Sequence, residues 1–549
     1  MAEPKFFQCR MVSSLAKVFP NRICGLSSKR SDAAQGQEIS FQIAFRLHYH
    51  RYLKQTFHVK ASSPLGACVS LFRVGTVPSR LPVYPERQDD KYLTNVPGLF
   101  PDPLFPLENG QVTASMGVWQ ALWVSVKIPA DCPAGDYPVT VSFVDAEGNS
   151  LAKVTHRVAV HAVTLPQQTL IFTQWFHCDC IADVHHVPVF SEAHWELIGK
   201  YMRLAAAHGM NMILTPIVTP PLDTAVGTER PTVQLVDVTK DGDTYTFGFE
   251  RLRRYVETAL TSGIRYFEIC HLFTQWGAKH APKVVATVNG KKRRIFGWET
   301  DACSDEYATF LRAFVPATLS YLKSLGLDES QIYFHVSDEP RPIQLEAYRS
   351  AHDILMPLIG SCKHMDAMSK YDFYQNGLVQ TPVISINHLE PFVEAKVPGL
   401  WAYYCCGQCV NVPNRFFAMP SARNRIMGVL LYKYAVEGFL QWGYNFYYSA
   451  LSTRKIDPYC ETDADMAFPS GDSFSVYPYK DGVIPSLRQK VFANALEDIR
   501  LLERLEEKIG RARVVEELDR LAGEPLTFVR YPIDERFFER LYQFIFDNL

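Results

Sequence analysis

The chain has 549 residues, which is too long for one ordinary domain and predicts two or three. Lys and Arg together number 56 against 58 Asp and Glu, so the charge balance gives no sign of a nucleic-acid partner. No apolar run is long enough to cross a bilayer, so we expect no membrane partner either. The composition does not indicate an oligomeric state.

The N-terminus and the cysteines predict the cellular location. Residues 1–10 lack a charged start, a long apolar run and a small-residue cleavage site, so we expect no signal peptide. The 13 cysteines are odd in number and scattered, and they include the adjacent Cys405 and Cys406. Without an export signal, they are expected to be reduced thiols of a cytoplasmic protein.

Residues 1–165 are predicted to form a β-sandwich domain. Short segments rich in β-branched and aromatic residues alternate with turn signals, for example at 145–149. The clearest predicted strands cover residues 39–47, 121–128, 137–144 and 153–163. Residues 81–106 are rich in proline and are expected to form a long surface connection. Such a domain is either a carbohydrate-binding module or a support for the rest of the chain, and we favour support.

Residues 166–480 are predicted to form a (β/α)₈ catalytic barrel. Eight short apolar segments predict strands at 170–175, 210–215, 264–270, 332–337, 361–367, 382–386, 400–404 and 438–442. Amphipathic patterns predict helices between several of them, at 192–208, 249–262, 305–325, 343–358 and 422–436. The spacing after the fifth and sixth strands is short, so the helices there are expected to be stunted.

Two predicted hairpins interrupt the barrel pattern, and a helical segment ends the chain. Asp-Gly and Asn-Gly turns predict hairpins at 232–247 and 283–296, after the second and third strands. At those places they are expected to wall a deep pocket over the barrel mouth. Residues 481–549 are predicted to be a C-terminal helical segment packed on the barrel, from the charged helical pattern at 486–518.

The acidic pair Asp338 and Glu339 follows the fourth predicted strand and is the candidate catalytic centre. Taken alone, this pair before Pro340 favours a helix cap. At a barrel strand exit, however, the same carboxylates face the mouth, where such enzymes place catalytic groups. Strict strand alternation would put Glu339 and Asp338 on opposite faces, so both reach one ligand only if the strand ends or bulges near Ser337. Two neighbouring carboxylates also raise each other's proton affinity, which suits a general acid.

Polar and aromatic residues also cluster at the other predicted strand exits. Carboxylates and flat rings at one barrel mouth favour a sugar-binding site. For the aromatic residues 276, 404, 442 and 444, packing in the core is an equal alternative. The candidate substrate-binding residues are Trp175, His177, Glu268, His271, Trp276, Asp366, Tyr403, Tyr404, Trp442, Tyr444 and Asn445.

Asp338-Glu339, behind a β-rich N-terminal region, resembles glycoside hydrolase family 123 and the related domain-of-unknown-function family 4091. The resemblance extends to the motifs at 400–404, 438–445, 457–458, 477–478, 484–488 and 496–498. It does not include residues 175–180 or 219–223. It implies exo-acting, retaining hydrolysis of a β-linked N-acetylhexosaminide, N-acetylgalactosamine in that family, in which the acetamido oxygen of the substrate attacks the anomeric carbon. Asp338 would then orient the acetamido group, and Glu339 would act as general acid and base.

Three alternatives remain open. Glu268 could be a nucleophile opposite Glu339 on a sugar without an acetamido group, although binding a sugar hydroxyl or pairing with a basic residue is favoured. The chain could instead be a non-catalytic carbohydrate-binding protein. A metal hydrolase would use the crowded residues His177, Cys178, Asp179, Cys180, His185 and His186, with His271. Their spacing matches no standard zinc pattern, so we expect no metal and no other cofactor.

Overall fold

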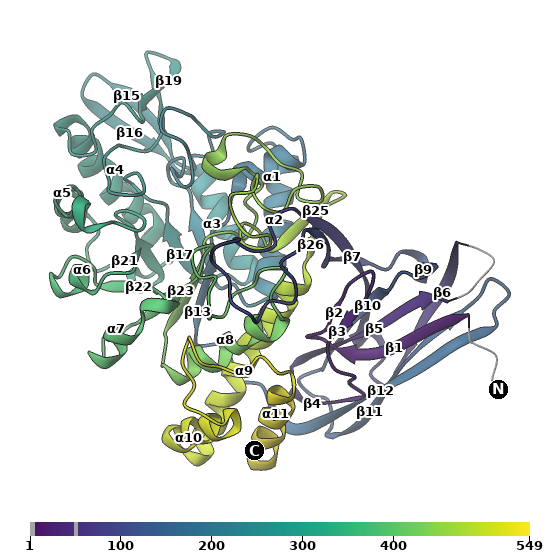
Figure 1. Cartoon of the computed structure of the whole chain (residues 1–549). Helices are drawn as coiled ribbons and strands as arrows, with labels where there is room; N and C mark the ends of the chain where they lie inside the picture. The colour runs from purple at the N-terminus through teal and green to yellow at the C-terminus, as the bar shows by residue number, and fades with distance from the viewer. Residues whose placement is uncertain (1–5, 49–52) are drawn as a thin grey trace.

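The computed structural model describes residues 6–48 and 53–549, and its N-terminal region folds into two facing five-stranded sheets (Figure 1). Residues 1–5, part of the stretch in which no signal peptide is expected, lie outside the described residues. The first sheet has the order β1 (Phe7–Ser13), β5 (Glu38–Leu47), β10 (Gln120–Lys127), β7 (Val69–Ser79) and β8 (Gly98–Pro106). The second has the order β4 (Arg30–Gln35), β12 (Ser150–Thr164), β11 (Gly135–Val144), β6 (Lys54–Ser62) and β9 (Gln111–Ser115). The predicted β-sandwich is confirmed.

Strand alternation explains how the sandwich attaches to the rest of the molecule. Along β5, Phe41, Ile43 and Phe45 lie in the core between the two sheets. The intervening Ala44, with Trp123 on β10, belongs instead to the core shared with the barrel. The first sheet is therefore buried on both faces, and the sandwich and barrel are joined by continuous apolar packing.

The prediction of a surface connection at 81–106 is wrong for its second half. Residues 98–106 form β8, which pairs antiparallel with β7 at the edge of the first sheet. Proline lacks the backbone N–H that a central strand needs, but an edge strand tolerates it. Asp102 in this strand is fully buried. Its charge is compensated by the guanidinium of Arg488, which binds both of its carboxylate oxygens at 2.8 and 2.9 Å.

Eight parallel strands form the closed barrel that the sequence predicts. They are β13 (Ile171–Gln174), β14 (Met212–Thr215), β17 (Tyr266–Ile269), β20 (Ile332–Phe334), β21 (Lys363–Met368), β22 (Thr381–Ser385), β23 (Trp401–Tyr403) and β24 (Gly438–Gln441). The ring closes because β13 pairs with both β14 and β24. Their carboxyl ends therefore meet at one mouth.

The helices follow the sequence signals closely. They are α2 (Glu192–Ala207), α3 (Glu250–Ser262), α4 (Asp305–Ser324), α5 (Leu345–Leu355) and α8 (Ser421–Lys433), whereas the short α1 (Cys178–Val184) was not predicted. The hydroxyls of Ser191 and Ser304 cap α2 and α4, and Gly263 ends α3 in the left-handed conformation. The expected stunting is confirmed, since α6 (Tyr371–Gln375) and α7 (Glu390–Glu394) have five residues each.

The two predicted hairpins combine into one four-stranded sheet, which projects from the barrel in Figure 1. Its strands are β15 (Asp237–Asp241), β16 (Thr244–Gly248), β18 (Val284–Val288) and β19 (Lys291–Phe296). The parallel pairing of β15 with β18 joins the hairpins. The first hairpin starts later than predicted, because Val233, Leu235 and Val236 are buried in the main core as irregular chain.

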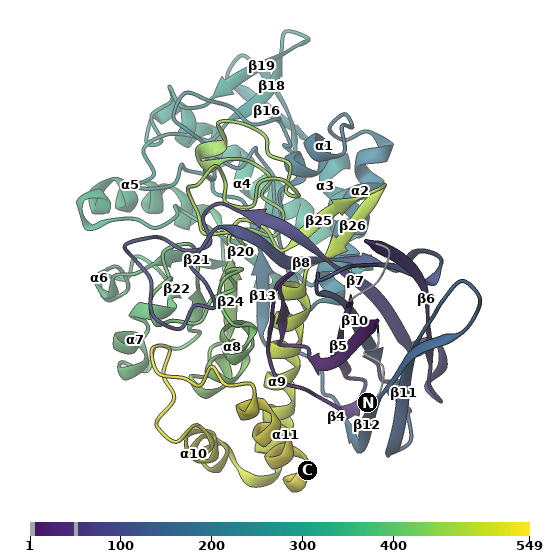
Figure 2. The same cartoon turned by 45° about the vertical axis from the view of Figure 1, so that its right-hand side comes forward.

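The chain ends in three helices, of which the first lies between the barrel and the sandwich and the other two pack near its lower end (Figure 2). They are α9 (Leu487–Ile509), α10 (Arg511–Ala522) and α11 (Arg536–Asn548). On the barrel side, Arg425 of α8 binds both carboxylate oxygens of Asp498 of α9 at 2.9 Å. Twelve of the cysteines in the described residues, from Cys24 to Cys460, are free thiols. Within residues 6–48 and 53–549, no helix has both the length and the apolar character needed to cross a membrane.

Candidate active site

Asp338 and Glu339 lie on the loop that follows β20, at the carboxyl end of the barrel strands. The regular strand ends at Phe334, and Glu339 adopts the left-handed backbone conformation with a φ of 44°. Strand alternation therefore stops before the two acids, which is the condition for both to reach one ligand. Both residues are half-buried. Left-handed backbone is uncommon for residues other than glycine and gathers at functional sites.

Backbone hydrogen bonds hold the acidic pair between the two neighbouring barrel strands. The N–H of Trp276, on the loop after β17, donates to the carbonyl oxygen of Asp338 at 3.0 Å. The N–H of Glu339 donates to the carbonyl oxygen of Ala367, on β21, at 3.2 Å. The loop is thus tied on both sides, and the carboxylates are positioned before any ligand binds.

The two carboxyl groups have different surroundings. The hydroxyl of Tyr403, at the end of β23, donates to Oε1 of Glu339 at 2.5 Å. Burial, followed by the charge of Glu339, raises the pKa of Asp338 well above its ordinary value, while His335 partly opposes this rise. The pair can therefore retain one proton above the pH at which a solvent-exposed carboxyl group would lose it.

A buried charged network fills the barrel below the acidic pair. Nε2 of His335 lies 2.7 Å from Glu268, and its Nδ1 lies 3.1 Å from Asp366. Burial alone would lower the pKa of His335, but its hydrogen bonds with Asp366 and Glu268 raise it to about 10. Despite its own burial, Asp366 has a lowered pKa, because His335 and His364 hydrogen-bond to its carboxylate. His335 is thus an imidazolium ion between two carboxylates.

Glu268 and Asp366 do not line an open site, contrary to the prediction that they bind substrate. Both are 0% exposed. Glu268 accepts hydrogen bonds from the hydroxyl of Thr173 at 2.7 Å and from the indole N–H of Trp175 at 2.6 Å, as well as contacting His335. Trp175 is itself buried, so its role is to orient Glu268 rather than to contact a sugar. Glu268 pairs with a basic residue, which was the favoured alternative to a nucleophile.

His271 stacks on His335, with ring centroids 4.2 Å apart and an angle of 15° between the rings. His271, His335 and Asp366 each present a ligand atom within 4.8 Å of the others, which meets the distance requirement of a metal site. A histidine binds a metal through a lone pair in its ring plane, and nearly parallel stacked rings cannot aim two such lone pairs at one ion. The donor set therefore does not fit a metal that binds both histidines.

The crowded segment at 177–186 is occupied by an internal ion pair rather than arranged as a ligand set. The guanidinium of Arg230 binds both carboxylate oxygens of Asp179 at 2.7 and 2.8 Å, and both side chains are buried. The same guanidinium lies 3.2 Å from Nδ1 of His177. Asn445 bonds the backbone N–H and carbonyl of His177. His177 and Asn445 are therefore structural, and their prediction as substrate contacts is corrected.

The aromatic residues that were predicted to contact the sugar fall into two groups by their exposure to solvent. Tyr404 and Tyr444 are 1% and 0% exposed, and their hydroxyls bond Asn424 and the carbonyl of Tyr201. Neither ring can stack on a sugar in this structure, so both predictions are corrected in favour of core packing. Trp442 is partly buried, with its indole N–H donating to Asp472 at 2.9 Å. Trp276 is 42% exposed and remains the best-placed stacking candidate.

Sequence reasoning missed the residues that hold the buried network together. His335 precedes the acidic pair, and His364 and Tyr348 contact the far side of Asp366 at 2.9 and 2.5 Å. The available signal was a histidine inside an apolar strand, at the inward position shared with Ser337. Its partners lie 31 and 67 positions away in the chain, so no local pattern identifies them.

Comparisons with known proteins identify a matching family and one solved structure that shares the fold. A family model described as "Glycoside hydrolase 123, catalytic domain" matches residues 175–505. A solved family 123 glycoside hydrolase from Clostridium perfringens, studied for glycolipid glycan hydrolysis, shares the fold with a TM-score of 0.74. The match covers 98% of this chain and 97% of that chain at 15% identity. A β-glucuronidase from Parabacteroides merdae matches over 89% of this chain and 51% of its own, at 11% identity and a TM-score of 0.32. No curated protein sequence matches the chain.

Proposed function

The chain belongs to glycoside hydrolase family 123, and from this premise we propose that it removes a terminal β-linked N-acetylhexosamine with retention of configuration. The acetamido group of the sugar serves as the nucleophile. Asp338 orients that group, and Glu339 is the general acid and base. By the family resemblance the sugar is N-acetylgalactosamine.

The observation that carries this proposal is the arrangement of the four carboxylates around β20. Asp338 and Glu339 are half-buried neighbours on a loop where strand alternation has ended. Glu268 and Asp366 are closed off and share the imidazolium of His335. A retaining enzyme with its own nucleophile needs two carboxyl groups about 5–5.5 Å apart on either side of the bond. With Glu268 enclosed, attack by the substrate itself fits this site better.

The proposed reaction has two steps in which Glu339 exchanges one proton. First, the acetamido oxygen attacks the anomeric carbon and the glycosidic C–O bond breaks. Glu339 protonates the departing oxygen, while Asp338 accepts the acetamido N–H and stabilises the developing positive charge. Second, Glu339 removes a proton from water, which attacks the anomeric carbon and regenerates the acetamido group. Two displacements at one carbon retain its configuration. The hydrogen bond from Tyr403 fixes the Glu339 carboxyl for both proton transfers.

A panel of aryl glycosides tests the proposal. The wild-type protein is expected to cleave β-glycosides with a 2-acetamido group and to leave the matching 2-hydroxy sugars intact. Asp338→Asn and Glu339→Gln are each expected to lower kcat/KM by about 10²- to 10⁴-fold, because each removes a group acting at the transition state. Glu346→Gln, on the neighbouring helix α5, is the control and should retain full activity. Cleavage of the 2-hydroxy sugars at similar rates would rule out substrate assistance.

A further inference from the structure

The loop after β17 presents buried polar atoms that the protein leaves without partners. Among the described residues, Nε2 of Gln275 and both ring nitrogens of His271 make no hydrogen bond. Gln275 is 8% exposed and His271 is 1% exposed. Buried polar atoms are seldom left unpaired, because their desolvation is then uncompensated. All three atoms lie within the segment that leads from β17 to Trp276, so this part of the barrel mouth is suited to a polar ligand.

The partner of the Gln275 side chain shows which of its groups is available. The backbone N–H of Asp223 donates to Oε1 of Gln275 at 2.6 Å. This contact fixes the orientation of the amide, since a donor must meet the oxygen. Nε2 and its two N–H groups are therefore left for another acceptor beside Asp223. The 219–223 segment lay outside the sequence resemblance, and the structure brings its last residue to this loop.

Asp223 supplies the matching acceptor. It is half-buried on the loop after β14. Its Oδ2 accepts the N–H of Leu451 at 3.0 Å, and its carbonyl oxygen accepts the hydroxyl of Ser452 at 2.6 Å. Its Oδ1 makes no hydrogen bond within the described part of the chain, although burial raises the pKa of this carboxyl to about 6. A free carboxylate oxygen and free amide N–H groups thus belong to two residues that are joined by a hydrogen bond.

This donor–acceptor pair adjoins the proposed catalytic residues. Gln275 and Trp276 are consecutive, and the Trp276 N–H is the group that holds the backbone of Asp338. The charge of Asp223 also contributes to the raised pKa of Asp338, after burial, Glu339 and Asp366. The exposed Trp276 ring lies on the same segment. One short loop therefore connects a stacking ring, the acidic pair and the Asp223–Gln275 pair.

We propose that Asp223 and Gln275 bind two neighbouring hydroxyls of the terminal sugar and determine which sugar the enzyme accepts. One hydroxyl donates to Oδ1 of Asp223, and the adjacent hydroxyl accepts from Nε2 of Gln275. An acceptor and a donor placed side by side match a vicinal diol, in which each hydroxyl can play either role. The assignment rests on the proposed function for the location of the sugar ring, and it extends that function to substrate recognition.

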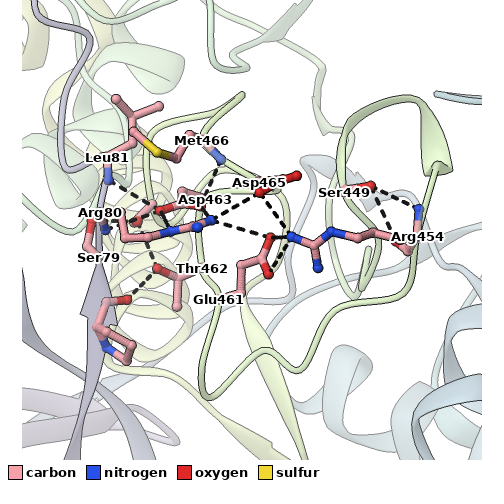
Figure 3. Close-up of polar contacts among 12 residues, drawn as sticks. Ser79, Arg80, Leu81, Ser449, Arg454, Glu461, Thr462, Asp463, Asp465 and Met466 are labelled. Atoms are coloured by element: carbon pink, nitrogen blue, oxygen red, sulfur yellow. Dashed lines mark hydrogen bonds and ion pairs between the residues drawn. The ribbon is translucent and has the colours of Figure 1, made fainter.

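Ion pairs lie along the connection whose Leu451 and Ser452 contact Asp223. Leu451 and Ser452 belong to the connection after β24, and Arg454 further along it binds Glu461 and Asp465 at 2.7 and 3.0 Å (Figure 3). These pairs add to the hydrogen bonds from Leu451 and Ser452, which position Asp223 without a ligand. Asp223 is therefore preorganised, which reduces the entropy lost when a sugar binds.

Two conservative variants test the assignment because they reverse hydrogen-bond polarity and keep the loop contacts. Asp223→Asn can still accept from Leu451 but places an amide at the Oδ1 position. Gln275→Glu can still accept from the Asp223 N–H but offers no donor to the sugar. Each is expected to weaken binding of a thio-linked, hydrolysis-resistant N-acetylgalactosaminide by about 10- to 100-fold in titration calorimetry. Asp328→Asn, a cap at the opposite end of β20, is the control and should bind like wild type.

Analogues that lack one hydroxyl separate recognition from a structural effect. Wild type should lose affinity for the 3-deoxy and 4-deoxy analogues, because C3 and C4 carry the only vicinal hydroxyls of a terminal 2-acetamido sugar. The corresponding variant should bind the matching analogue and the parent equally, and the 6-deoxy analogue should bind like the parent throughout. If both variants discriminate among the deoxy analogues as wild type does, or if wild type does not bind the parent sugar, the assignment is overturned.

Binding and turnover distinguish this inference from the proposed function. Sugar binding that depends on Asp223, without cleavage of any acetamido glycoside, would overturn the catalytic proposal and retain the recognition site. Cleavage of an acetamido glycoside, with discrimination among the deoxy analogues unchanged in both variants, would overturn the recognition site and retain the catalytic proposal.

Discussion

At the residue scale, His335 determines the electrostatics of the barrel interior. It converts two buried carboxylates, each costly alone, into a network with one positive centre. It also lies close enough to Asp338 to oppose the rise in its pKa. The same network explains why Glu268, the alternative nucleophile, is closed to substrate. Glu268 and Asp366 are thus structural, whereas Asp338 and Glu339 are available to a ligand.

Replacing His335 by Gln is expected to lower stability in a pH-dependent manner. The folded pKa of about 10 lies above the ordinary value of 6.5, so the stabilisation is complete below about pH 6.5 and is lost as pH rises through 10. Removing one member of a buried ion pair costs about 3–5 kcal/mol. The midpoint of thermal unfolding should differ widely between wild type and variant at pH 6 and converge toward pH 10. His352→Gln, on α5, is the control; a gap at His335 that does not change with pH would contradict the charged assignment.

At the element scale, the loop after β24 connects the sandwich to the barrel mouth. Arg80, which follows β7, binds Asp463 through its guanidinium at 2.8 Å and through its backbone N–H at 3.1 Å (Figure 3). The same guanidinium reaches Asp465, which Arg454 also binds. Leu451 and Ser452, nearer the mouth, contact Asp223. One connection therefore has a sandwich contact at one end and a contact with the proposed sugar site at the other.

Arg80→Ala is expected to loosen this connection without unfolding the protein. The Arg80 side chain is 47% exposed, which limits what its ion pairs contribute, and the backbone contact to the buried Asp463 remains in the variant. Hydrogen exchange should accelerate at residues 449–466, and kcat/KM should fall by less than about tenfold. Arg30→Ala removes a longer and more exposed pair with Asp32 elsewhere in the sandwich, and it should change neither quantity. Unchanged exchange at 449–466 in Arg80→Ala would show that the charge network does not fix the loop.

At the scale of the whole molecule, the sequence predicts the layers better than the contacts between them. Apolar runs and turn signals locate the eight barrel strands, because each strand leaves a local pattern. The edge strand β8 was not predicted, because its prolines are typical of a surface loop. Its buried Asp102 is neutralised by Arg488, which is distant in the sequence.

The residues of the candidate site also divide into those that the sequence pattern predicts and those that only the fold reveals. Asp338 and Glu339 are visible in the sequence as charges at a strand exit. Tyr404 and Tyr444 were predicted to bind substrate because composition does not distinguish an aromatic residue of the core from one that contacts a ligand. The ion pair of Arg230 with Asp179 joins residues 51 positions apart, so no local pattern revealed it. Long-range partners are what the sequence pattern lacks and the fold supplies.

The most direct test of the central claim varies the acetamido group itself. Aryl β-galactosaminides carrying N-acetyl, N-fluoroacetyl, N-difluoroacetyl and N-trifluoroacetyl groups differ in the electron density of the attacking oxygen, and they change little in size. If that oxygen attacks the anomeric carbon while Asp338 stabilises the charge that develops, kcat/KM falls steeply with each added fluorine. Rates that stay level across the four substrates would contradict substrate assistance at Asp338 and Glu339.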